Sequence, residues 1–153
     1  LQKLIVEVIE EFSGEKIPLS TFDGCGAPLH LMSLQGLARA IGKFAETETE
    51  IRDAMLANPW VVDDRGASDT SVMEKGMLAK IGAEGVFVIG LASGHGVAVK
   101  VADGSMRPAG LSAIKMLLNN DLLDKKVYDE LFAKLTVASL GGAEKLGQLE
   151  VAF

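Results

Sequence analysis

The first half of the chain has the hydrophobic periodicity of amphipathic helices. In residues 4–12 apolar side chains recur every three or four positions with glutamates between them, and Gly14 ends the run. The same spacing returns over residues 34–44, where Ser33 is placed to cap the helix. A third helix is predicted over residues 48–57. The pattern therefore predicts a largely helical N-terminal part.

The segment after the third helix is predicted to be less regular. The Asn58-Pro59 pair stops that helix, because a residue before proline disfavours helical backbone. We interpret residues 60–69 as a loop. Asp69 or Thr70 then caps a short helix that continues through Met77.

Apolar runs rich in valine and isoleucine predict strands in the second half. Residues 85–91 and 96–101 flank Ser93-Gly94-His95, a connection suited to a β-hairpin, and residues 77–81 provide a strand before them. Three such strands form an antiparallel meander. The other predicted elements are an extended segment at 19–22, helices at 111–118 and 126–135, and a closing strand at 146–152.

Helices that precede and follow an antiparallel sheet predict the α+β class, with helices packed on the sheet. A length of 153 residues fits a single domain over residues 1–153 and suffices to bury a core. No internal repeat, low-complexity tract or linker divides the sequence.

Composition narrows the classes of partner. Fifteen lysines and arginines against 21 aspartates and glutamates give a net charge of −6, which disfavours nucleic acid and anionic membranes as partners. No apolar run approaches the length of a membrane span, and no signal peptide is visible. The single cysteine cannot form an internal disulfide. We therefore expect a cytoplasmic protein.

The densest group of candidate residues lies in the turn at residues 23–28. Glycines 24 and 26 free the backbone for close approach by a ligand, and they flank Asp23 and Cys25. A cysteine beside backbone N–H groups can ionise and act as a nucleophile or a metal ligand. A buried structural cysteine in a tight turn explains the same residues equally well. His30 follows the turn and is a candidate base for Cys25.

Lys80 is the second candidate, because lysine is unusual at the end of an apolar strand unless its ammonium has a partner or a function. Glu84 lies four residues further on and is expected to pair with Lys80 or to bind a substrate amine. A solvated lysine on an edge strand is the competing interpretation. For Asp103 we favour a salt-bridged turn with Arg107 over catalysis, and we expect His95 to be exposed.

Four blocks of sequence, in order, resemble the bacterial L-asparaginase II family of the rhizobial type, which is unrelated to the threonine-dependent asparaginases. The blocks are Asp23-Gly24-Cys25-Gly26-Ala27-Pro28, residues 34–39, Ala79-Lys80-Ile81-Gly82-Ala83-Glu84-Gly85-Val86, and Lys100-Val101-Ala102-Asp103-Gly104 with Arg107. The resemblance runs over nearly the whole chain.

This resemblance implies a fold like that of serine β-lactamases and glutaminases, and hydrolysis of the side-chain amide of asparagine to aspartate and ammonia. Lys80 matches a strand lysine that handles the proton of a Ser-x-x-Lys-type nucleophile. Cys25 matches a cysteine that binds zinc together with a second cysteine and a lysine, and Asp23 an acid beside that metal. Glu84 and Asp103 are assigned as orienting residues. The chemistry itself requires no cofactor.

The nucleophilic serine, its lysine and the second zinc cysteine of the family have no match here. The sequence also begins at Leu1 without an initiator methionine. We therefore expect the C-terminal half of an asparaginase-like protein, supplying one wall of the active site and inactive alone. A small-molecule amide is the expected substrate, and a homo-oligomer or the N-terminal half is the expected partner.

Two competing hypotheses remain from the sequence. The first is a non-catalytic binding module, either a degenerate half-domain or a separate subunit. The second is a cysteine hydrolase that uses Cys25 with His30.

Overall fold

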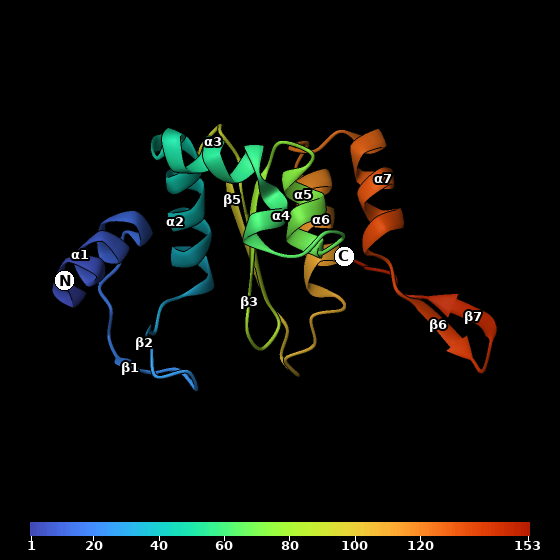
Figure 1. The fold of residues 1–153 in the computed structure, drawn as a ribbon, viewed down its shortest axis with the longest axis horizontal. Coiled ribbons are helices and arrows are strands. Elements are labelled where there is room, and N and C mark those ends of the chain that lie inside the picture. The colour runs from blue at the N-terminus through green and yellow to red at the C-terminus, as the bar shows by residue number, and fades with distance from the viewer.

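The computed structural model describes residues 1–153 and has the predicted α+β class, with helices packed around small antiparallel sheets (Figure 1). The helices are α1 Gln2–Ser13, α2 Leu34–Thr47, α3 Thr49–Ala57, α4 Pro59–Val62, α5 Ser68–Met73, α6 Ala109–Asn119 and α7 Lys125–Leu135. The strands are β1 Ser20–Phe22, β2 Pro28–His30, β3 Leu78–Gly82, β4 Val86–Gly90, β5 Gly96–Lys100, β6 Ala138–Gly141 and β7 Glu144–Gln148. None of the helices combines the length and the apolar character needed to cross a lipid bilayer.

The central sheet is the predicted meander, with strand order β3-β4-β5 and both pairs antiparallel. The register places Lys80, Val88 and Ala98 side by side, and because side chains alternate along a strand these three share one face. In Figure 1 α2 lies on one side of this sheet and α6 on the other. The sheet is therefore the middle layer of a three-layer arrangement.

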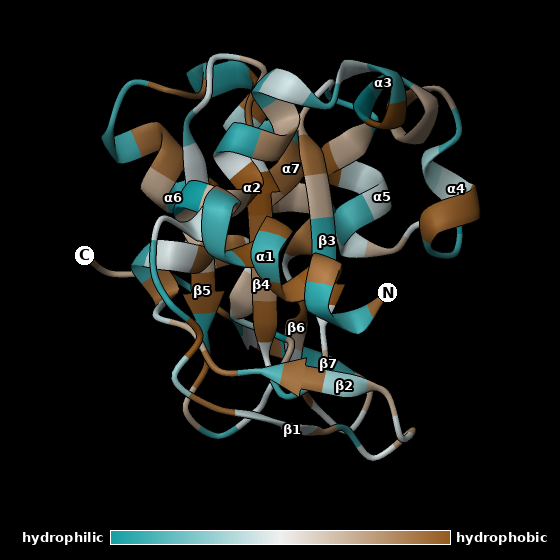
Figure 2. Cartoon of the chain, turned by 90° about the vertical axis from the view of Figure 1, so that its left-hand side faces the viewer, coloured by the Kyte–Doolittle hydropathy of each residue, from teal (hydrophilic) through white to brown (hydrophobic).

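The hydrophobic core lies between the sheet and α6. Phe87 and Ile89 are fully buried on this face, and a methyl on Gly110 of α6 would lie 3.6 Å from the Phe87 ring. Leu131 of α7 closes the core from behind α6. Figure 2 shows hydrophobic strands in the middle of the molecule, surrounded by helices in which hydrophobic and hydrophilic residues alternate. Packing on this face fixes the position of β3, which carries Lys80.

The opposite face of the sheet lies unusually close to α2. Gly96 of β5 faces the carbonyl oxygen of Ala38, and Gly90 of β4 faces the backbone of Ile41. A methyl on Gly90 would also stand 2.8 Å from the Ala45 side chain. These glycines allow helix backbone to lie directly on strand backbone, which any larger residue would prevent.

The α1 helix and the β1–β2 hairpin lie outside α2. Phe12 of α1 packs on Phe44 of α2 with 6.4 Å between ring centroids. Ser33 caps α2 as predicted, and its hydroxyl accepts a hydrogen bond from the Gly36 N–H. The β1–β2 pairing continues the predicted extended segment into a full hairpin.

Three predictions about the elements were wrong. Residues 60–69 are not a continuous loop, because Pro59–Val62 form the single turn α4. The α5 helix has Ala67 as its N-cap and ends at Met73, so neither Asp69 nor Thr70 caps it and it does not reach Met77. The closing strand at 146–152 is replaced by the β6–β7 hairpin, which ends at Gln148.

Candidate active-site wall

Lys80 projects from the middle of β3, an edge strand that pairs with β4 alone. Its side chain is 45% exposed, and its Nζ donates a hydrogen bond to the Ile81 carbonyl at 3.2 Å. Its neighbour across the sheet is the buried Val88. Lys80 is therefore an accessible ammonium group on an otherwise apolar strand.

A buried carboxylate that the sequence prediction missed lies beside this ammonium. Asp69 of α5 is fully buried, and its Oδ2 lies 3.5 Å from Lys80 Nζ. The same oxygen accepts the Ile81 N–H at 3.2 Å, and Oδ1 accepts the Thr70 N–H at 2.9 Å. Burial of a carboxylate is costly unless such partners satisfy it. No feature of the sequence distinguishes this Asp from a helix cap.

Glu84 does not pair with Lys80, which leaves the other expected role, binding of a substrate amine. The chain turns sharply between β3 and β4, and Glu84 sits in this turn at a positive φ of 59° with its side chain exposed. Its carboxylate lies against Gly104, where a methyl would stand 2.7 Å from Oε2. The β3–β4 turn and the turn after β5 therefore lie side by side.

Asp103 lies in that second turn and is exposed. Its Oδ1 accepts the Ser105 N–H at 2.9 Å, and it forms no ion pair with Arg107. The predicted salt-bridged turn was therefore wrong. A side-chain to backbone hydrogen bond stabilises the turn instead.

The tip of the β1–β2 hairpin brings Asp23 and Cys25 together. Asp23 Oδ1 accepts the Gly24 N–H at 2.7 Å, and the Cys25 thiol donates to Asp23 Oδ2 at 3.6 Å. Gly26 closes the turn at a φ of 82°. Cys25 is exposed, which excludes the buried structural cysteine as an interpretation.

The two histidines have other partners. His30 Nδ1 lies 2.8 Å from the hydroxyl of Ser20, its cross-strand neighbour, and no hydrogen bond joins His30 to Cys25. His95 is exposed as predicted, and its Nδ1 lies 3.0 Å from the Ser93 hydroxyl. The structure therefore does not assemble a Cys25–His30 pair.

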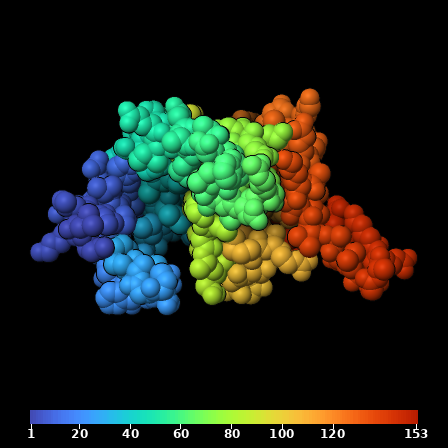
Figure 3. Space-filling view, viewed as in Figure 1, coloured from blue at the N-terminus to red at the C-terminus, as the bar shows by residue number.

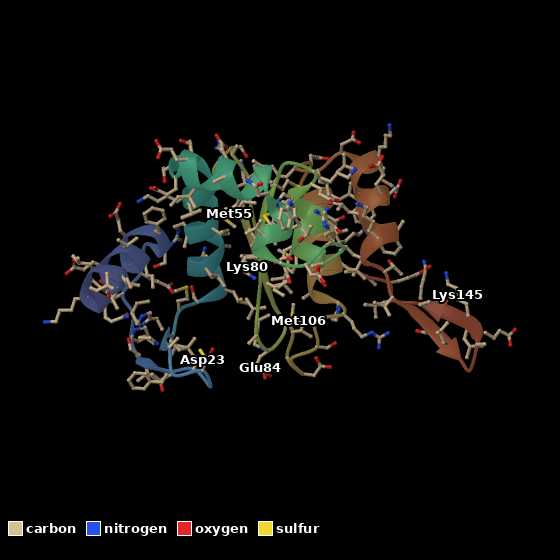
Figure 4. The ribbon with its side chains drawn as sticks, viewed as in Figure 1. Asp23, Met55, Lys80, Glu84, Met106 and Lys145 are labelled. Atoms are coloured by element: carbon tan, nitrogen blue, oxygen red, sulfur yellow. The ribbon has the colours of Figure 1, made fainter.

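The surface is hollowed between the hairpin and β3. Figure 3 shows this recess beneath α2, and in the same view Figure 4 places Asp23 on the hairpin side and Lys80 with Glu84 on the β3 side. The largest cavity lies elsewhere, a groove of about 520 Å³ between α1 and the hairpin that includes His30. Lys80 does not line this groove.

Metal ligands are incomplete in this arrangement. No group of three or more histidine, cysteine, aspartate or glutamate side chains is placed to hold a metal ion. Asp23 and Cys25 provide two neighbouring donors. A tetrahedral zinc ion with ordinary Zn–S and Zn–O distances keeps such donors about 3.6 Å apart. The same 3.6 Å separates Sγ and Oδ2 in the hydrogen bond that the Cys25 thiol donates, so the distance by itself does not assign Asp23 as a ligand.

The sequence was compared with known proteins and protein families. No curated protein sequence matches it. The sequence model of the L-asparaginase II family matches residues 1–151, which span both the hairpin and the β3–β4 turn. A match of that extent shows that this chain belongs to the L-asparaginase II family.

Proposed function

We propose that the protein is an amidohydrolase that converts L-asparagine and water to L-aspartate and ammonia, with this chain as one wall of the active site. Membership of the L-asparaginase II family supports the reaction class. The observation that carries the proposal is Lys80, a half-exposed ammonium at the edge of an apolar sheet, paired with a buried carboxylate.

Amide hydrolysis requires a group that takes the proton of the attacking hydroxyl and a proton for the departing nitrogen. In this proposal the Lys80 ammonium, whose side chain is 45% exposed, gives a proton to the departing nitrogen, and the amine left behind takes a proton from the attacking water. Glu84 and Asp103 border the neighbouring turns and are proposed to orient the substrate.

The nucleophile is proposed to come from outside these 153 residues. The Ser-x-x-Lys sequence at Ser112 to Lys115 lies within α6, where Ala113 and Ile114 are fully buried. The Lys115 Nζ stands over the Tyr128 ring at 5.7 Å. This segment therefore serves the packing of α6 on α7 in our proposal.

The test is ammonia release from asparagine by the full-length protein. Removing a proton-handling group costs about 10²- to 10⁴-fold in rate, so Lys80→Met should lose at least about a hundredfold. Lys100→Met is the matched control on the other edge strand and should retain activity. Unchanged turnover in Lys80→Met would remove Lys80 from the mechanism.

Zinc is proposed to bind through Cys25 Sγ, with Asp23 beside the metal and the remaining ligands from outside this chain. The fit rests on the exposure of the Cys25 thiol and on the carboxylate of Asp23, whose Oδ2 lies 3.6 Å from Sγ. Bound there, zinc would supply positive charge next to the recess. Dialysed full-length protein should hold zinc by elemental analysis and lose it in Cys25→Ser. Equal zinc content in both proteins would contradict the assignment, and His30→Gln is the control.

A non-catalytic interaction module is the second candidate. It is favoured by the large apolar side chains left on the surface, among them Phe22 at 74% and Leu146 at 71% exposed. The ammonia-release assay distinguishes the two candidate functions. Full-length protein that releases no ammonia from asparagine, glutamine or another amide would favour the module.

A further inference from the structure

Two lysines of the central sheet make the same backbone contact in different surroundings. Lys80 on edge strand β3 and Lys100 on edge strand β5 each donate to the carbonyl of the next residue, at 3.2 and 2.7 Å. Lys80 alone of the two faces a carboxylate, that of Asp69. Lys100 therefore shows how a lysine of this sheet is held without an acidic partner.

Hydrogen bonds hold the Asp69 carboxylate in place. Its carboxylate is held by the N–H groups of Thr70 and Ile81. The Thr70 hydroxyl in turn contacts the carbonyls of Pro59 and Asp63 at 3.3 and 3.4 Å, which ties α5 to α4. The carboxylate is thus held between its own helix and β3, and the long Lys80 side chain is the part that can move.

None of the other charged side chains on the neighbouring elements forms an ion pair with Asp69 or Lys80. Glu74 and Lys75, which follow α5, form ion pairs with α7 residues Lys134 and Glu130 at 2.9 and 2.5 Å. On α3, which also contacts β3, Arg52 pairs with Asp53 at 2.8 Å, and Glu50 forms no ion pair. Strand β4 carries no charged residue. Asp69 is therefore the ion-pair partner of Lys80.

We propose that Asp69 is the positioning residue of Lys80: its buried carboxylate holds the Lys80 ammonium at the edge of β3 while more than two fifths of that side chain stays exposed to a substrate. Holding a group in one place before reaction is a major source of catalytic rate. The consequence for turnover rests on the proposed function, whereas the pairing itself can be tested without turnover.

The first experiment measures the rate at which an amine-reactive acetyl ester labels each lysine, by peptide mass spectrometry. An ammonium held by a carboxylate must leave it before the amine can react. In Asp69→Asn the amide oxygen can accept the Ile81 N–H, whereas the NH2 group replaces the acceptor of the Thr70 N–H, so the charge and one hydrogen bond are lost. The labelling ratio of Lys80 to Lys100 should rise about two- to fivefold, the factor that a partly exposed ion pair supplies. Glu74→Gln is the matched control and should leave the ratio unchanged.

An unchanged ratio in folded Asp69→Asn would overturn the proposal. If that variant does not fold, the ion pair is tested through its exposed member instead, by thermal unfolding of Lys80→Met. Removing the ammonium leaves a buried carboxylate without its counter-charge, so the unfolding temperature should fall by several degrees more than in Lys100→Met. Equal unfolding temperatures of these two variants would also overturn the proposal.

The second experiment is a double-mutant cycle on ammonia release by the full-length protein. If Asp69 acts through Lys80, Asp69→Asn lowers kcat with little change in KM, and it adds nothing in a Lys80→Met background. Additive losses would overturn the positioning role. Full activity of Lys80→Met would instead refute the proposed function of Lys80, and the labelling ratio would still decide whether Asp69 holds it.

Discussion

Gly96 of β5 lies directly against the carbonyl oxygen of Ala38 in α2, with no room for a side chain between them. A methyl at position 96 would overlap that oxygen and approach the Gly42 nitrogen to 2.8 Å. Both neighbours are backbone atoms, which cannot rotate away as a side chain can. The contact therefore sets the distance between α2 and the sheet.

Gly96→Ala should accordingly destabilise the protein, by about 1–3 kcal/mol or more, the cost of overpacking a tight interior. Urea unfolding followed by circular dichroism measures the loss. Gly147 is a strand glycine with open space around it, so Gly147→Ala should stay within about 0.5 kcal/mol of the parent. Equal stability of the two variants would show that α2 can move off the sheet.

Glu15 ties the end of α1 to the start of α2 and makes stability depend on pH. Its carboxylate accepts the Ser33 hydroxyl at 2.7 Å and the Ser33 N–H at 2.6 Å, and these hydrogen bonds lower the pKa of Glu15 from its ordinary 4.5. Because the pKa is lower in the folded state, the stabilisation is present above the unfolded pKa and is lost as pH falls through the folded one.

Glu15→Gln should therefore lower the urea midpoint at neutral pH, and the difference from the parent should shrink as the pH falls through the lowered pKa of Glu15. Glu150→Gln removes an exposed carboxylate without hydrogen-bond partners and is the control. A difference for Glu15→Gln that stayed constant from pH 7 to acid would contradict the prediction.

Phe87 anchors the core between β4 and α6. It is fully buried, and replacement by alanine should cost about 3–5 kcal/mol through lost burial and the cavity left behind. Phe22 at the end of β1 is 74% exposed, so Phe22→Ala serves as the control and should change stability little. Thermal unfolding of both variants gives the comparison. A mild effect at Phe87 would mean that the core repacks readily.

An apolar stripe along α1 predicts self-association. Leu4 and Val8 are 61% and 51% exposed one turn apart, and Leu1 and Ile5 continue the stripe. Light scattering should give a mass above 16.1 kDa that falls in Leu4→Lys with Val8→Lys. A monomer at all concentrations would contradict this expectation.

The elements that the sequence predicted correctly are those with local signals. The meander follows from apolar runs separated by glycine turns, and α2 from its period and the Ser33 cap. The single turn α4 has no period to detect, and its carbonyl at Pro59 is held by Thr70, 11 residues away in sequence.

Of the candidate site, Lys80 could be found from the sequence because a charge interrupts an apolar strand. Its partner could not, because the contact between Asp69 and Ile81 spans 12 residues and depends on how α5 docks on β3. The expected Lys80–Glu84 pair is absent because of the tight turn between β3 and β4. Spacing of four residues says little about proximity once a tight turn intervenes.

The hydrogen bonds at Ile81 also bear on aggregation at high protein concentration. An edge strand offers unpaired N–H and C=O groups to which a strand of another molecule can add, and such addition starts aggregation. At Ile81 the N–H is taken by Asp69 and the C=O by Lys80. The same two side chains therefore block β3 at its centre as a template for fibril growth.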